Sequence, residues 1–586
     1  MSPETGTVPK SVKLRIESRM RIIAWTVGIV FGLIQAWSDR FSMLPDGISY
    51  LDIADNIVQR NWSGAVNAYW SPLYSWLLAA GFYVLRPSAY WEYPVVHLIN
   101  FVVYLISFAC FEFLLSQIIS YQQRVQKAGG DSSLPSWAWQ CVGYVLFLWS
   151  ALFLIGVSEV TPDMAVAALV FCLGGLLIRI RRQPDKLINY IGFGIALGVA
   201  YLAKAVMFPL GFVFLGILFF PLRNWRKALP RILVASVMFL LVSAPFIVAL
   251  HNQKNRWTFG DSGKLAYAWL IEGTEPYIHW QGNPPEAGVP AHTTRKIFDV
   301  PAVYEFKEPF KVTYSPWFDP TYWNEGMIGH FNAKGQLRVL FGSTLSFYAI
   351  LINSSIGVSA LMSFLVLILY KRPRAREWRA GISLLNLILP ALAAFAIYAL
   401  VHVQSRYLGA FVVLFWLGMF SSVRLSPDRS SHNLLRAVVI ALVAVSMTVM
   451  TAKSVAPAGS VLRDLIGKGN SPSLPYWPVA DGLAKLGLQP GDQIGSIAYG
   501  FAGVAYSARL AKLNIVAEIC TGTEVSPKDD VDKFWHTDPE TQRRVIEAFK
   551  STGAKAIVAN RLPPGLAAPA GWQRIGSTDH FVYLLK

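Results

Sequence analysis

Long runs of apolar residues recur along this chain, and they restrict its fold more than any other feature of the sequence. The chain has 586 residues, of which 54% are hydrophobic and only 15% are charged. Apolar runs of about 18 residues or more are long enough to cross the hydrocarbon core of a bilayer as helices. The short alternating segments typical of a closed β-barrel are not seen. The sequence therefore predicts a mainly α, polytopic helical membrane protein.

About eleven membrane spans are predicted from these runs. They lie at residues 22–39, 94–118, 138–157, 162–179, 188–205, 207–222, 231–250, 344–370, 381–402, 406–423 and 434–452. The net charge is +17, and the Lys and Arg residues gather in every second connection between the spans. Because cytoplasmic loops carry such an excess of positive charge, we expect the N-terminal segment 1–21 to lie inside. The positive charge then needs no nucleic acid to explain it.

An odd number of spans with the N-terminus inside places three long segments outside. Residues 40–93 and 251–343 are outer loops of a transmembrane domain at 22–452, and residues 453–586 follow it. The last segment predicts a small extracytoplasmic α/β domain, with strands near 494–498, 514–519, 555–559 and 580–585. Its sequence contains no phosphate loop, nucleophile elbow or metal motif. The four cysteines of the chain have neither zinc-site nor disulfide spacing, so we expect small hydrophobic residues.

The first outer loop begins with an acidic residue and an amphipathic pattern. Apolar residues at 48, 51, 54, 57 and 58 share one face of a predicted helix, which leaves Asp52 and Asp55 on the other. We expect this helix to lie in the membrane interface with both carboxylates solvated. Asp46 stands just before it, where the chain leaves the bilayer. Its residue type fits either a helix cap or a functional carboxylate.

Aromatic residues follow in the same loop. Tyr69, Trp70 and Tyr74 lead into an apolar helix at 73–86, which is too short to span a bilayer. They are either belt residues of the membrane interface or the lining of a groove for a lipid chain or a sugar ring. The sequence leaves both interpretations open.

Ionisable residues gather at the outer ends of several predicted spans. Glu159 and Asp163 flank the turn between spans three and four, and Lys204 ends span five. His402 and Arg406 flank the turn between spans nine and ten. A charge costs roughly 2.5–3.5 kcal/mol at the centre of a spanning helix and less near its end. Snorkelling explains a single cation there, whereas acids and bases at one membrane depth predict a polar site beneath the outer loops.

Taken together, these features resemble membrane glycosyltransferases of the GT-C class, within the group of protein O-mannosyltransferases and the lipid A aminoarabinose transferase. The matching features are Asp46 in the first outer loop, Thr161-Pro162-Asp163, Ala203-Lys204 and Arg406-Tyr407-Leu408. The likeness covers roughly residues 20–450 in architecture. It departs at Asp46-Gly47, where the mannosyltransferases carry Asp-Glu, so mannose and a protein acceptor do not follow from it.

The resemblance implies transfer of a sugar, with inversion, from a polyprenyl-phosphate donor to an extracytoplasmic glycan, lipid or protein. It makes Asp46 the general base, and it makes Lys204 and Arg406 the residues that bind the donor phosphate. The residues that would position the substrate are Tyr50, Glu159, Asp163 and His402. The expected location is the bacterial cytoplasmic (inner) membrane. No cofactor is implied, although two neighbouring carboxylates are able to hold a divalent cation.

Two other functions stay open from the residues alone. A transporter or flippase of lipid-linked sugar would carry charges near the midplane and repeat symmetry, whereas the charges here lie at span ends. A polymerase or ligase that uses a diphosphate-linked donor would carry paired arginines in a large late outer loop. The loop at 251–343 has Arg256 and Arg295 but nothing that resembles a catalytic pair.

Overall fold

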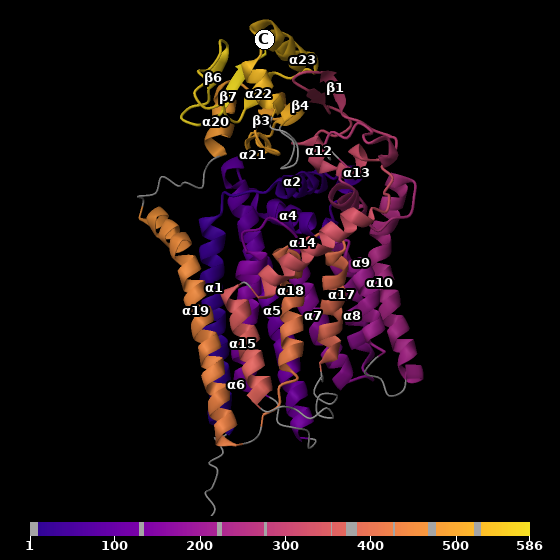
Figure 1. Cartoon of the computed structure of the whole chain (residues 1–586), viewed down its shortest axis with the longest axis vertical. Coiled ribbons are helices and arrows are strands. Elements are labelled where there is room, and N and C mark those ends of the chain that lie inside the picture. The colour runs from indigo at the N-terminus through magenta and orange to yellow at the C-terminus, as the bar shows by residue number, and fades with distance from the viewer. Residues whose placement is uncertain are drawn as a thin grey trace, which may run out of the picture.

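A bundle of apolar helices with one mixed sheet at its end makes up the chain (Figure 1). The computed structural model describes residues 10–127, 134–219, 225–274, 278–352, 354–370, 384–425, 428–466, 476–520 and 529–585. The helices run along the long axis of the molecule, and the sheet caps one end of them. The chain is therefore mainly α-helical with a small C-terminal sheet region, as the sequence predicts.

Most apolar helices of the bundle fall where the sequence predicts spans, whereas the predicted span 344–370 is divided between two helices that start at Ala333 and Ser355. The bundle helices are α1 (Lys10–Ser38), α5 (Glu92–Lys127), α6 (Ser136–Trp149) with η2 (Ser150–Ile155), α7 (Asp163–Arg182), α8 (Leu187–Ala203), α9 (Met207–Ile217), α10 (Trp225–Lys254), α14 (Ala333–Leu351), α15 (Ser355–Tyr370), α17 (Leu385–Ala399), α18 (Ser405–Phe420) and α19 (Arg429–Leu465). Among the described residues, six helices are long and apolar enough to cross a membrane, or up to seven if the pair α14 and α15, bent by 78°, is one span. Five others are apolar but shorter: α8, α9, α17 and α18 of the bundle, and the helix Pro72–Leu85 of the first outer loop. The number of eleven spans is thus not confirmed.

Short helices fill the space between the bundle and the sheet. From the first outer loop these are α2 (Pro45–Val58), α3 (Trp62–Ala65), α4 (Pro72–Leu85) and η1 (Ala89–Trp91). From the second they are α11 (Ser262–Tyr267), η3 (Ala268–Glu272), η4 (Pro285–Ala287), α12 (Ser315–Phe318) and α13 (Pro320–Trp323). Helix α2 lies across the end of the bundle beneath the sheet (Figure 1). Its residues from Gly47 to Ala54 are all buried, so it is covered on every side.

The sheet combines two segments that are far apart in the sequence. Its order is β1-β2-β4-β3-β5-β7-β6. The strands from the C-terminal segment are β3 (Gln493–Ala498), β4 (Asn514–Cys520), β5 (Ala556–Ala559), β6 (Trp572–Arg574) and β7 (Phe581–Leu584). The hairpin β1 (Arg295–Phe298) and β2 (Val303–Glu305) comes from the outer loop 251–343, and β2 pairs antiparallel with β4. The sequence predicted β3, β4, β5 and β7 but not this hairpin.

Apolar packing between the central strands and the neighbouring helices holds the sheet in place. Strands β3, β4 and β5 are parallel neighbours, and their near-continuous burial is typical of parallel strands covered on both faces. The helices of this segment are α20 (Trp477–Lys485), α21 (Ala505–Leu510), α22 (Asp529–His536) and α23 (Pro539–Ser551). Leu510 and Ala480 from this segment join one buried core with Leu51 and Val312 from the two outer loops. The sheet region and both loops therefore form one packed cap.

Five charged residues fasten helix α21 to the helices below it, and we call them the docking cluster. Arg509 is buried, and its guanidinium lies 2.8 Å from Asp52 Oδ1, 2.7 Å from Asp55 Oδ2 and 2.6 Å from Glu92 Oε1. Lys512 Nζ lies 2.5 Å from Glu92 Oε2. Asp52 also accepts hydrogen bonds from the backbone and side chain of Thr313. The prediction that Asp52 is solvated was therefore wrong, because the polar face of α2 is covered by the C-terminal segment and not by water.

Candidate active site

Five residues that the sequence singled out lie together at the end of the bundle, and we call them the charge cluster. Arg406 is at its centre: Nη2 lies 3.4 Å from Asp46 Oδ2, Nε lies 3.7 Å from Asp163 Oδ2, and Nη1 lies 4.0 Å from Glu159 Oε2. Lys204 Nζ donates to Asp163 Oδ1 at 2.5 Å. Three carboxylates thus surround two cations. The acids and bases that the sequence places at the ends of spans therefore lie in one cluster.

Helix ends set the positions of three members of the cluster. Asp46 is the second residue of α2, Asp163 is the first residue of α7, and Arg406 is the second residue of α18. The N-terminus of a helix carries partial positive charge, so it favours both aspartates and disfavours the arginine. The guanidinium, whose side chain is only 17% exposed, is held there by three carboxylates from two other segments. This placement is costly for a purely structural arginine.

Asp46 does not cap its helix. The N-cap residue of α2 is Leu44, which makes no side-chain hydrogen bond to the helix. The Asp46 carboxylate instead accepts a hydrogen bond from Trp317 Nε1 at 3.2 Å on Oδ1, while Oδ2 faces Arg406. Of the two interpretations that the sequence left open, the structure therefore excludes the cap.

Gly47 allows α2 to approach the loop that carries the other carboxylates. A Cβ atom at this position would lie 2.5 Å from Met43 Sδ and 2.8 Å from Val160 Cγ1. Contacts this short do not occur for real side chains, so only glycine lets the start of α2 touch residues 156–162. The residue that departs from the mannosyltransferase pattern thus brings Asp46 close to Glu159.

The loop between η2 and α7 is fixed from both sides. Gly156 ends η2 with a φ of 88°, a conformation that favours glycine. Asn100 donates from Nδ2 to the backbone carbonyl of Glu159 at 3.0 Å, and Tyr74 donates to Asn100 Oδ1 at 2.6 Å. Burial raises the pKa of Glu159, and the positive charge of Arg406 opposes that shift. The Glu159 carboxylate, 39% exposed, is the most accessible acid of the cluster.

Lys204 is held by a carboxylate and an aromatic ring. It follows α8 in extended conformation, and its Nζ lies 3.5 Å from the centroid of the Tyr407 ring. A cation over an aromatic face gains roughly 0.5–2 kcal/mol. The partner carboxylate, Asp163, also accepts a hydrogen bond from Thr161 Oγ1 at 2.9 Å. Thr161 and Tyr407 were noted in the sequence only as part of the resemblance.

Tyr50 and His402 lie beside the cluster. Among the described residues, neither has a hydrogen bond or ion pair with a cluster member. Burial, and then the charges of Asp46 and Asp163, raise the pKa of Tyr50, whose ring packs edge-on against Trp70 and Tyr74. The His402 ring meets Tyr407 edge-on at 6.3 Å, and burial together with Arg406 and Lys204 lowers its pKa.

Aromatic side chains from four segments meet at Trp317, which donates to Asp46, and we call them the aromatic wall. Trp317 is at its centre, and its ring centroid lies 4.8 Å from Phe501, 5.7 Å from Tyr69, 5.8 Å from Trp70 and 6.2 Å from Trp269. Trp70 is buried, so it is not a membrane-belt residue. Phe501 comes from the C-terminal segment, which therefore reaches the carboxylate through one indole ring. No periodic pattern in the sequence marks Trp317 or Phe501.

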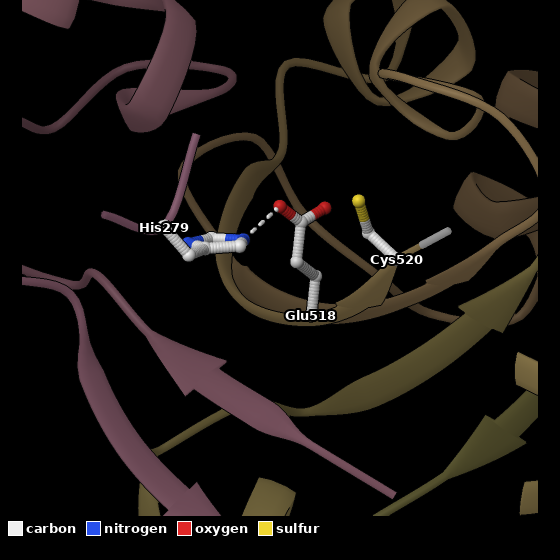
Figure 2. Close-up of side chains that lie close together, drawn as sticks. All are labelled: His279, Glu518 and Cys520. Carbon is white, nitrogen blue, oxygen red and sulfur yellow. Dashed lines mark hydrogen bonds and ion pairs between the residues drawn. The ribbon is translucent and has the colours of Figure 1, made fainter. Parts of the chain in front are cut away.

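Metal-binding groups are grouped elsewhere. Within the described ranges, the one set of three or more His, Cys, Asp or Glu ligand atoms close enough to share an ion is His279, Glu518 and Cys520 (Figure 2). The three carboxylates of the charge cluster do not form such a set, because Arg406 lies between them. The divalent cation that the sequence allows at those carboxylates stays a prediction.

No protein-family model matches the chain, and no curated protein matches it in sequence. Solved structures resemble it at low identity. The crystal structure of ArnT from Cupriavidus metallidurans bound to undecaprenyl phosphate has 14% identity and a TM-score of 0.49, with 96% of this chain and 97% of that chain covered. The crystal structure of the same ArnT in the apo state has 14% identity and a TM-score of 0.47, with 96% of this chain and 98% of that chain covered. The crystal structure of the Archaeoglobus fulgidus oligosaccharyltransferase in complex with Zn and sulfate has 12% identity and a TM-score of 0.47, with 92% of this chain and 68% of that chain covered. The similar structures are thus two of ArnT and one of an oligosaccharyltransferase.

Proposed function

We propose that this chain is a membrane glycosyltransferase that moves a sugar from a polyprenyl-phosphate donor to an acceptor hydroxyl, with inversion at the anomeric carbon. The proposal rests on the charge cluster, in which two cations and three carboxylates meet at helix ends beneath the outer loops. This combination supplies both halves of a displacement: positive charge for a leaving phosphate and a carboxylate for the attacking hydroxyl. We place the reaction at the outer face of the bacterial inner membrane.

Arg406 is suited to the donor phosphate because its guanidinium has donor capacity to spare. In the part of the chain that the structure describes, the buried Nη1 atom has no hydrogen-bond partner. A guanidinium binds phosphate with two parallel N–H donors, which adds orientation to charge. Lys204 contributes a second positive charge from the neighbouring segment. As the phosphate leaves the sugar, both cations stabilise the negative charge that develops on it.

Asp46 is the group we assign as general base. The acceptor oxygen attacks the anomeric carbon while the carbon–oxygen bond to the phosphate breaks, and the hydroxyl proton passes to the carboxylate. Trp317 and Arg406 each approach one carboxylate oxygen, so the carboxylate is held in a fixed orientation. A positioned base contributes about 10²–10⁴ in rate. The donor phosphate leaves with the electron pair of the broken bond.

Neighbouring residues suit the sugar and the acceptor. The aromatic wall offers flat apolar surface against which one face of a sugar ring is able to stack. Glu159 and Asp163 accept hydrogen bonds from hydroxyls, while Tyr50 and the neutral imidazole of His402 line the same region. A divalent cation would suit the excess of one negative charge in the cluster if both cations and all three acids are ionised. The sugar and the acceptor are not specified by these contacts.

The experiment is transfer of labelled sugar from polyprenyl-phosphate donors in membranes, with wild type compared with Asp46→Asn. Asp481→Asn is the matched control, because Asp481 lies on the surface helix α20 and pairs there with Lys485. We expect Asp46→Asn to lose at least about 10²-fold in transfer at normal expression, and the control to keep full transfer. Unchanged transfer by Asp46→Asn would refute the assigned base. If wild type transfers from none of several such donors but is active with diphosphate-linked donors, or moves lipid-linked sugar across the membrane, the proposed reaction is wrong.

A further inference from the structure

Three potential metal ligands meet where the outer loop lies against the C-terminal strands. Glu518 and Cys520 are two residues apart on β4, so both side chains project from the same face of the sheet. His279 comes from the outer loop and faces them (Figure 2). One ligand atom from each residue lies within 4.8 Å of the other two. Two segments that are distant in the sequence thus present nitrogen, oxygen and sulfur to one point.

Neighbouring side chains hold two of these residues in place. Thr294 Oγ1 lies 3.1 Å from His279 Nδ1, which leaves Nε2 directed to Glu518 at 2.9 Å. The imidazole ring stacks on Tyr304 with centroids 4.3 Å apart. Tyr314 donates to Glu518 Oε1 at 2.6 Å. Metal-binding imidazoles and carboxylates are usually oriented in this way by hydrogen bonds from residues that do not touch the ion.

We propose that His279, Glu518 and Cys520 bind one zinc ion, which clamps the outer loop 251–343 to the C-terminal sheet. Imidazole, carboxylate and thiolate are all zinc ligands, and a thiolate disfavours magnesium and calcium. A water molecule or a polar group of a ligand completes the fourth position. The site is separate from the charge cluster and shares no residue with it, so it goes beyond the proposed transfer reaction.

The bound zinc ion would strengthen the contact between the outer loop 251–343 and the C-terminal sheet. Strand β2 pairs with β4 at Tyr304–Glu518 and Glu305–Ala517, and the loop after it adds backbone hydrogen bonds from Phe306 N to Val516 O and from Ile515 N to Thr313 O. The contact between the outer loop and β4 is therefore one short run of backbone pairing. An ion bound between His279 and β4 adds bonds at Glu518, which is also the residue of β4 that pairs with Tyr304 of β2. The same outer loop carries Trp317, which reaches Asp46, so the position of the loop bears on the charge cluster.

A buried hydrogen bond between His279 and Glu518 is the competing explanation, and Cys520 distinguishes the two. The hydrogen bond needs no sulfur, whereas the zinc site needs the thiolate. A thiol that coordinates zinc loses its proton to become the thiolate ligand. Zinc binding should therefore release protons and protect the sulfur.

The test measures zinc in the purified full-length chain, in detergent and without chelator, by inductively coupled plasma mass spectrometry. We expect about one zinc ion per chain in the wild type and loss of most of it in Cys520→Ser and His279→Gln. Cys141→Ser and His292→Gln are matched controls from outside the site and should keep the wild-type content. Wild-type content in Cys520→Ser, or no zinc in a wild type that also fails to take up added zinc, would overturn the proposal.

A second measurement needs no variant, so it stands even if the substitutions prevent folding. The wild-type chain is stripped of metal with a chelator and treated with iodoacetamide, with and without added zinc. Alkylation of Cys520 is followed by peptide mass spectrometry, with Cys141 as internal reference. We expect zinc to slow alkylation of Cys520 at least about tenfold relative to Cys141, because the coordinated thiolate is shielded. Equal protection of both cysteines, or none, would contradict the site.

Discussion

Replacing Arg509 tests whether the docking cluster holds the C-terminal segment on the bundle. The variant Arg509→Gln removes one positive charge that contacts three carboxylates, Asp52, Asp55 and Glu92. Asp52 and Glu92 stay buried, at side-chain exposures of 4% and 5%. Lys512 still neutralises Glu92, but Asp52 loses the only ion-pair partner that it has among the described residues. The substitution therefore leaves an uncompensated charge in the interface.

The expected cost follows from this geometry. Removal of one partner of a buried ion pair destabilises a protein by about 3–5 kcal/mol, because the remaining charge is desolvated without compensation. For a unit of the size of the C-terminal segment, each kcal/mol shifts the midpoint of thermal unfolding by roughly 2–4 °C. We therefore expect the midpoint of that segment to fall by on the order of 10 °C. Protonation of Asp52 at low pH should reduce the loss.

Thermal unfolding in detergent, followed by tryptophan fluorescence, measures the effect, with hydrogen exchange of α21 and α2 as the local readout. Arg543→Gln is the control, because Arg543 pairs with Glu540 on an exposed helix face and should change nothing measurable. A compensated variant, Arg509→Met with Asp52→Asn and Glu92→Gln, should recover most of the lost stability. A loss below about 1 kcal/mol in Arg509→Gln, or no recovery in the compensated variant, would refute the reasoning.

Three further predictions concern the charge cluster and helix α2. Arg406→Lys keeps the charge but loses the two-pronged donor, so transfer from a labelled donor should fall about 10²–10³-fold; a change of only a few-fold would contradict phosphate binding by the guanidinium. Gly47→Ala should lower both transfer and the unfolding midpoint, since overpacking costs about 1–3 kcal/mol, whereas Gly192→Ala, with open space around its Cβ, should leave both unchanged. Burial raises the pKa of Asp52 from 3.8 to about 6, so the folded state binds this proton more tightly than the unfolded state. The stabilisation is full below pH 3.8 and is lost as the pH rises through 6, so the unfolding midpoint of wild type should fall relative to Asp52→Asn over that range; a constant difference would contradict the shift.

The charge cluster was predictable from sequence because its members stand at the ends of apolar runs. A charge there is exceptional, and the alternation of basic loops assigns each end to one side of the membrane. Five residues from four segments could therefore be placed at one depth without a structure. Their contacts could not, because the order of helices around the bundle is not encoded in hydropathy. The role of Trp317 escaped for the same reason: it lies in an outer loop with no periodicity.

The cap was predicted less well, because long-range contacts decide its structure. The amphipathic pattern of α2 separates an apolar from a polar face, but it does not say what covers the polar face. Here Arg509 covers it, from more than four hundred residues further along the chain. Strands β1 and β2 have four and three residues, too few for an alternating signal to stand out. Glu518 and Cys520 showed no metal-site spacing in the sequence because the third ligand, His279, lies far away in the outer loop 251–343.

The shared sheet also sets an order of assembly. The ribosome makes the hairpin β1–β2 long before it makes β4, and domains generally fold in the order of synthesis. Until β4 arrives, the outer edge of β2 has its backbone groups unpaired, and such an edge is a template for aggregation. The pairing of this loop is therefore incomplete until the C-terminal segment has been made. Chains that terminate before β4 should survive poorly in the cell, even though nearly all of the helical bundle has been synthesised.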